Sequence, residues 1–128
     1  MIKLFSQYKF FFYLLNLILI SLYLSPTTIV RVFIHSDLYF YSQISPDFKV
    51  SVNHIYVFLI FSFIGFLTYQ KSKNFMILSI YLILLSIILE LIHLLIPYRG
   101  FEFADLFGNI IGVIIASIIS YFFKKHKN

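Results

Sequence analysis

Residues 90–112, ELIHLLIPYRGFEFADLFGNIIG, gather groups that could do chemistry inside an otherwise apolar chain. The stretch holds three of the five acidic residues of the protein, and its ionisable members are Glu90, His93, Arg99, Glu102 and Asp105. Carboxylates and imidazoles at short spacing can transfer protons, bind metal ions or hold a polar ligand. An arginine guanidinium suits a phosphate or carboxylate group. The stretch therefore predicts a polar functional site.

Helical spacing places these polar residues on two helix faces. Glu90, His93 and Pro97 are separated by three and four residues, which puts them on one side of a helix. At 1.5 Å per residue, Glu90 lies about 10 Å below the helix end that Pro97 predicts. Asp105 and Asn109 begin a second stripe, and Asp105 is also a candidate N-cap of the helix that follows.

Small residues and a further histidine extend the predicted site. Gly108 and Gly112 form a small-xxx-small pattern, which lets another helix approach closely. His54 opens another apolar segment, with Phe58 below it on the same face. We expect these stripes to converge on one pocket. Its candidate residues are His54, Glu90, His93, Arg99, Asp105 and Asn109, with Gly108, Gly112 and Pro97 as packing residues.

Each candidate also has a plain structural interpretation. A role as a helix cap would be enough to explain Asp105. A structural hydrogen bond between helices would be enough to explain Asn109. His54 suits the edge of a membrane, and Arg99 suits a lipid headgroup. Glu90 is the hardest to explain in this way, because burying a carboxyl group costs stability unless a partner offsets the cost.

The composition indicates the elements that position these residues. Of 128 residues, 61% are hydrophobic and 12% are charged, whereas soluble domains average about 25% charged residues. The chain is therefore expected to be an integral membrane protein with a single domain, residues 1–128. Cysteine is absent, which excludes disulfides and thiolate chemistry. The net charge of +5 comes from short runs beside apolar segments, so we expect no nucleic-acid partner.

Four apolar segments predict an all-α membrane protein, an antiparallel bundle of four transmembrane helices. A bilayer core needs about 20 mostly apolar residues in a helix. Pro26 and Pro97 suit helix ends, and QKSKN at 70–74 suits a tight turn. The link 26–51 is a longer outer loop whose secondary structure the sequence does not define. The predicted spans are residues 8–25, 52–69, 75–96 and 106–123.

The basic residues predict the orientation of the bundle. Seven of the ten flank the two termini and the 70–74 turn, namely Lys3, Lys9, Lys71, Lys73, Lys124, Lys125 and Lys127. Positive charge favours the cytoplasmic side, so both termini are expected there. The candidate pocket then faces outward.

The chain resembles the VanZ-like family of bacterial membrane proteins over essentially its whole length. The motif of that family is a Glu, a Gln, Pro-x-Arg, then Asp, Asn and Gly. The matching residues here are Glu90, His93 in the Gln position, Pro97, Arg99, Asp105, Asn109 and Gly112. His54, Phe58 and Gly65 are similar to an upstream His-aromatic-Gly piece, and SLYLSP at 21–26 to the end of the first span. The resemblance implies a multi-pass protein of the bacterial cytoplasmic membrane and cell envelope, in a family linked to glycopeptide, especially teicoplanin, resistance.

The leading interpretation is a protein that binds a lipid-linked or envelope ligand, such as a cell-wall precursor, in the outward-facing pocket. Arg99 would meet an anionic group, and Glu90, His93 and His54 would supply polar contacts. We expect no metal and no other cofactor.

Two alternatives stay open. The first is an intramembrane enzyme that uses His54, Glu90 and His93, and it includes a mononuclear metal site formed by these residues with Asp105. The second is a non-catalytic membrane scaffold, because the glycine stripe suits helix association. The expected partner is the lipid bilayer, and the sequence is also compatible with association of several copies of the chain into a homo-oligomer. Transport is disfavoured, since four short spans leave little room for a pathway.

Overall fold

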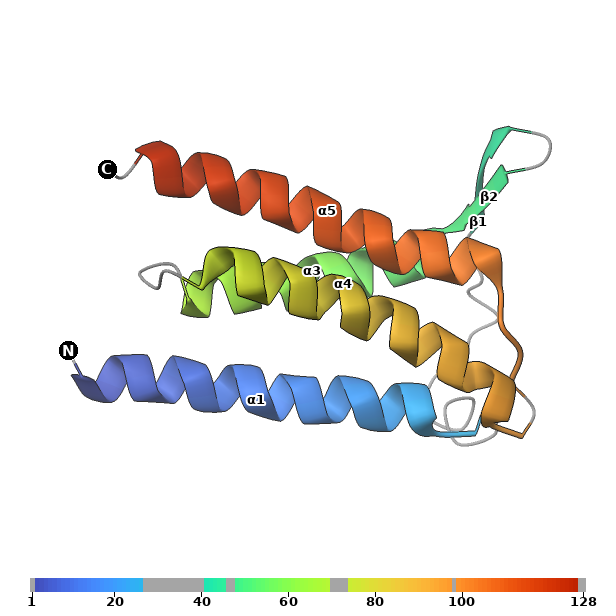
Figure 1. The fold of residues 1–128 in the computed structure, drawn as a ribbon, viewed down its shortest axis with the longest axis horizontal. Helices are drawn as coiled ribbons and strands as arrows, with labels where there is room; N and C mark the ends of the chain where they lie inside the picture. The colour runs from blue at the N-terminus through green and yellow to red at the C-terminus, as the bar shows by residue number, and fades with distance from the viewer. Residues whose placement is uncertain (1, 27–40, 46–47, 70–73, 98, 127–128) are drawn as a thin grey trace.

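The computed structural model describes residues 2–26, 41–45, 48–69, 74–97 and 99–126. Over these residues the chain forms four long helices that lie side by side in one bundle (Figure 1). They are α1 (Ile2–Leu24), α3 (Val52–Thr68), α4 (Phe75–Ile92) and α5 (Phe103–His126). The predicted helical fold is confirmed at this level.

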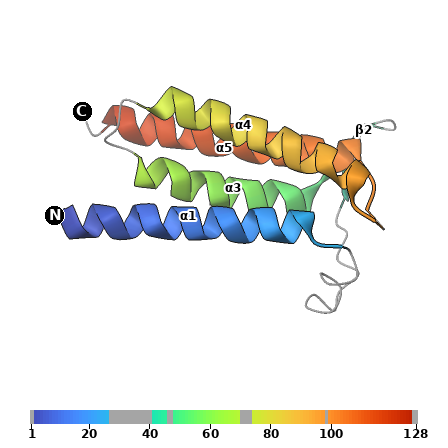
Figure 2. The ribbon, with the colours of Figure 1, turned by 60° about the horizontal axis from the view of Figure 1, so that its bottom comes forward.

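Successive helices run in opposite directions, so both ends of the chain lie at the same end of the bundle (Figures 1 and 2). At the other end, α1 and α4 finish and α3 and α5 begin. We call this the polar end, and it is defined by Tyr23, His54, Glu90 and Asp105. The antiparallel order therefore brings together residues that are up to 82 positions apart in the chain.

Local sequence explains where the helices stop. α1 ends at Leu24, two residues before Pro26, whose ring has no N–H to donate. α4 tightens into a 3-10 turn, η1 (His93–Leu95), and then into a turn in which the Arg99 N–H donates to the Ile96 carbonyl at 3.2 Å. Pro97 occupies the second position of that turn, where its fixed φ is favourable.

A short β-hairpin precedes α3, and the sequence analysis did not assign it. β1 (Tyr41–Ser45) pairs with β2 (Phe48–Ser51) in antiparallel register, and β2 leads directly into α3. The rest of the link, residues 27–40 and 46–47, lies outside the described residues, as do residues 70–73 of the predicted tight turn. The hairpin places Ser51 beside the first turn of α3, where it contacts the candidate site.

The core is built mainly from aromatic and branched side chains that all four helices contribute. Phe58, Leu82 and Val113 are fully buried, and the ring of Phe12 stacks on that of Phe61 with 5.2 Å between centroids. Much apolar surface also faces outward, including Ile77 and Leu95, which are 66% and 83% exposed. Soluble monomers rarely expose such extensive apolar area.

Two helical segments meet the length and hydropathy of a membrane span. Phe75–Leu95 has 21 residues and a mean hydropathy of 2.7, and Phe103–His126 has 24 residues and 2.1. In each, 33% of the most apolar window is buried inside the bundle, so the rest of it is at least partly exposed. The apolar part of α1, Tyr8–Leu24, and α3 are shorter. The bounds also differ from the predicted spans, because α5 begins at Phe103 rather than at residue 106.

Candidate functional site

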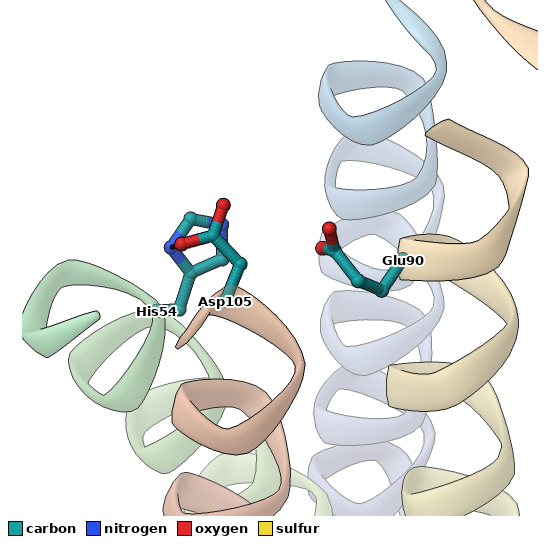
Figure 3. Close-up of side chains that lie close together, drawn as sticks. All are labelled: His54, Glu90 and Asp105. Carbon is teal, nitrogen blue, oxygen red and sulfur yellow. Dashed lines mark ion pairs between the residues drawn. The ribbon is translucent and has the colours of Figure 1, made fainter. Parts of the chain in front are cut away.

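The polar end gathers ionisable side chains from three helices. His54 lies in the first turn of α3, Glu90 in the last turn of α4 and Asp105 in the first turn of α5. Figure 3 shows the side chain of Glu90 directed toward those of His54 and Asp105, which are 51 positions apart in the chain. His93 is hydrogen-bonded to Glu90, and Arg99 is hydrogen-bonded to His93. Asn109 forms its hydrogen bonds with Tyr23 and with the carbonyl of Ser86. The structure therefore brings all six predicted pocket residues to one end of the bundle.

Glu90 is the most enclosed charged residue of this site. Its side chain has no exposed surface, and Oε1 lies 3.3 Å from Nδ1 of His93. The backbone N–H of Glu102 also donates to Oε1, at 3.2 Å, because the link after Pro97 folds back over the end of α4. The second oxygen, Oε2, is buried and has no hydrogen-bond partner among the described residues. Oε1 is thus held by His93 and by the Glu102 N–H, whereas Oε2 can accept a further hydrogen bond or bind a ligand.

His93 connects Glu90 to Arg99. Nη1 of Arg99 donates to Nε2 of His93 at 2.9 Å, so Nε2 must be the unprotonated nitrogen of the ring. Nδ1 then carries the proton, and this N–H donates a hydrogen bond to Oε1 of Glu90. The imidazole is therefore assigned as neutral, with both nitrogens engaged.

Tyr23 is a member of the site that the sequence analysis did not single out. Its ring stacks on His93 with 5.4 Å between centroids, and its hydroxyl donates to Oδ1 of Asn109 at 3.0 Å. The side-chain amide of Asn109 in turn donates to the carbonyl of Ser86 at 3.4 Å. The available signal was a phenol at the end of the first span, in the SLYLSP segment, at the same depth as the other polar groups.

His54 and Asp105 form a second pair. Nδ1 of His54 lies 3.3 Å from Oδ1 of Asp105 and 2.7 Å from the hydroxyl of Ser51. Both side chains are mostly buried, with 21% and 14% of their surface exposed. The expectation that Asp105 caps α5 is wrong, because α5 begins at Phe103 and Asp105 already lies inside its first turn. Its N–H donates to the carbonyl of Glu102 instead.

The glycines bring α5 close enough to α3 for that pair to form. A Cβ atom added at Gly108 would lie 2.5 Å from the carbonyl oxygen of Ser51, and one at Gly112 would lie 2.6 Å from that of Ile55. Neither position can hold a larger side chain without moving backbone, that of Ser51 just before α3 in one case and that of α3 itself in the other. The two helices therefore meet along a face that only glycine allows at these two positions.

A cavity of about 540 Å³ lies in a different part of the bundle, between α1 and α4 toward the end with the termini. Its lining is mainly apolar and includes Phe12, Leu17 and Ile77. Asn16 lies within it, and its amide donates to the hydroxyl of Tyr81. None of the predicted pocket residues lines this cavity.

The chain has no match among protein-family models, curated proteins or solved structures. The resemblance to VanZ-like membrane proteins therefore stays a prediction.

Proposed function

We propose that this chain is a four-span protein of the bacterial cytoplasmic membrane that binds an anionic, lipid-linked envelope ligand at its polar end. The two longest apolar segments would cross the bilayer together with α1 and α3. α1 has 23 residues, which at 1.5 Å per residue gives a rod of about 34 Å, enough for a hydrocarbon core of about 30 Å. Its exposed apolar residues, such as Leu17, suit contact with lipid.

The proposed orientation has both termini in the cytoplasm and the polar end outside. Lys9 lies in α1 toward the N-terminus, and Lys124 and Lys125 lie in the last turn of α5. The beginning of α1 and the end of α5 lie at the end of the bundle opposite the point where α4 finishes and α5 begins (Figure 1). The positive-inside rule then favours a cytoplasmic position for the lysine-rich end.

The hydrogen bonds of Arg99 are the main support for the proposal that the ligand is anionic. Nη1 donates to the neutral ring of His93, and Nη2 donates to the backbone carbonyl of Leu22 at 3.2 Å. Neither acceptor is charged. The side chain is half-buried and fixed in place by its two acceptors. A fixed, partly exposed guanidinium whose hydrogen bonds go to uncharged acceptors is suited to a phosphate oxygen.

The hydrogen bonds of His93 favour a binding site over a site in which this histidine is an acid–base catalyst. A general base needs a free ring nitrogen within reach of the proton it removes. Nδ1 of His93 is held by Glu90 and Nε2 by Arg99, so this ring serves to position the guanidinium. The stacked ring of Tyr23 fixes the plane of the imidazole from one side.

Retention of matched lipids tests the proposal. The purified protein is incubated in detergent with phosphatidic acid or with the diacylglycerol that has the same acyl chains, and bound lipid is measured by native mass spectrometry. We expect phosphatidic acid to be retained preferentially. Arg99→Gln should weaken its retention about ten- to a hundredfold, because a hydrogen bond between charged groups contributes about 1.5–3 kcal/mol. Equal retention of the two lipids by the wild-type protein contradicts the proposal.

The control variant for this experiment is Lys125→Gln. It removes one positive charge from an exposed position at the opposite end of the bundle. We expect it to retain phosphatidic acid as the wild-type protein does. A loss equal to that of Arg99→Gln would mean that net charge, and not the site, determines retention.

A further inference from the structure

Three side chains at the polar end present ligand atoms to one small volume. His54, Glu90 and Asp105 come from α3, α4 and α5, and one ligand atom from each lies within 4.8 Å of the other two. In Figure 3 the carboxylate of Glu90 extends away from α4 toward the imidazole of His54 and the carboxylate of Asp105. This arrangement needs an explanation, because two of the three groups carry negative charge when ionised.

Two carboxylate oxygens in this cluster are buried without a hydrogen-bond partner among the described residues, Oε2 of Glu90 and Oδ1 of Asp105. The side chain of Glu90 is completely buried. Carboxylates that approach one another in a medium of low dielectric constant repel, and an unsatisfied buried oxygen loses its hydration without replacement. Arg99 does not neutralise them, since its hydrogen bonds go to His93 and Leu22. Among the described residues, no lysine or arginine therefore forms an ion pair with either carboxylate.

We propose that His54, Glu90 and Asp105 bind a divalent transition-metal ion such as Mn²⁺ or Zn²⁺. One imidazole and two carboxylates form a nitrogen and oxygen ligand set that suits these ions. The charge of the ion balances that of the two carboxylates. The sequence analysis expected no metal and left a site with four ligands as an alternative. The structure reduces that set to three, because both nitrogens of His93 are already engaged.

The spacing of the ligand atoms is close to what an ion requires. Two ligand atoms that are each about 2.1 Å from a metal ion lie at most about 4.2 Å apart. A pair of ligand atoms at the observed limit of 4.8 Å would therefore have to close by at least about 0.6 Å to bind the ion.

Neighbouring groups already orient the ligands. The Ser51 hydroxyl holds the ring of His54, and the Glu102 N–H holds Oε1 of Glu90 while Oε2 stays available. Such outer contacts are typical of metal sites.

The inference rests on the proposed function and deepens it. Three protein ligands leave at least one coordination position open for an exogenous oxygen. A phosphate oxygen at that position would meet the ion on one side and the guanidinium of Arg99 on the other. The ligand class is then a phosphate ester whose binding depends on the metal.

Metal binding is tested with the ion alone. The full chain is purified in detergent, stripped with EDTA and dialysed against Mn²⁺ or Zn²⁺, and bound metal is measured by plasma mass spectrometry. We expect one ion per chain in the wild-type protein. His54→Ala, Glu90→Gln and Asp105→Asn should each weaken binding about tenfold or more, since even outer contacts of metal sites contribute this much. No bound ion in the wild-type protein, or unchanged binding in all three variants, overturns the proposal.

A matched control comes from a histidine outside the cluster. His126→Ala removes an exposed histidine at the end of α5. It should bind one ion as the wild-type protein does, and weakened binding in it overturns the assignment to this cluster. Thermal unfolding with and without Mn²⁺ checks the fold of every variant. His54→Ala and Asp105→Asn alter less buried side chains and carry the test if Glu90→Gln does not fold.

The two proposals fail separately. Stoichiometric metal binding without preference for phosphatidic acid supports the metal site and removes the anionic ligand. Preferential retention of phosphatidic acid that is unchanged by EDTA supports the anionic ligand and overturns the metal site.

Discussion

Replacing Gly112 by alanine tests whether the contact between α3 and α5 positions the site. The added Cβ would lie 2.6 Å from the carbonyl oxygen of Ile55 and 2.8 Å from the backbone nitrogen of Leu59, whereas ordinary contact begins at 3.4 Å. The shortfall is about 0.8 Å, and the obstructing atoms belong to backbone, which cannot rotate away. α5 must therefore move away from α3.

Two opposing effects determine how much Gly112→Ala changes the free energy of unfolding. Overpacking costs about 1–3 kcal/mol, and the upper part of that range, about 2–3 kcal/mol, applies here because the obstructing atoms are backbone. The better helix propensity of alanine offsets about 1 kcal/mol. We expect a net loss of about 1–2 kcal/mol in the free energy of unfolding. The same shift separates Asp105 from His54, so metal affinity should fall as well, although neither ligand is changed.

The assay is thermal unfolding of the purified protein in one detergent, with Gly100→Ala and Gly65→Ala as controls. A Cβ at Gly100 meets nothing within 4 Å, so that variant should match the wild-type protein. A Cβ at Gly65 meets the ring of Phe12 at 2.7 Å, and a ring can move more readily than a backbone. An unfolding temperature for Gly112→Ala equal to or above that of the wild-type protein would refute the reasoning, because helix propensity alone would then decide.

Two further predictions concern the polar end. Tyr23→Phe removes the donor to Oδ1 of Asn109 and should lower the free energy of unfolding by about 1 kcal/mol. Tyr13→Phe removes the exposed hydrogen bond to Tyr69 and should change it far less in the same unfolding assay, so equal losses would contradict the role given to burial. Since the chain has no cysteine, single cysteines report the orientation of the bundle. A membrane-impermeant maleimide should label Gly100→Cys on intact cells and Lys125→Cys only after permeabilisation. The opposite pattern would reverse the proposed topology.

The sequence was sufficient for the helices and for contacts within them. Long apolar runs in a bilayer satisfy their backbone groups only as helices or closed barrels, so composition and length predicted the bundle. The approach of His93 to Glu90 followed from their spacing of three residues, because the period of a helix is fixed by its own hydrogen bonds. Helix ends were less well predicted. α5 starts at Phe103 because the link after Pro97 is shorter than expected, and Asp105 is therefore not a cap.

Contacts between helices depended on the tertiary structure. The sequence placed His54 and Asp105 at the same depth but could not specify their distance of 3.3 Å, which depends on how closely Gly108 and Gly112 approach the backbone of α3. The stacking of Tyr23 on His93 was also hidden, since it joins segments distant in the chain. The hairpin before α3 was not assigned either, although its two strands are adjacent in sequence. A helix fixes the spacing of its own residues through local hydrogen bonds, whereas the distance between helices depends on the packing of the whole bundle.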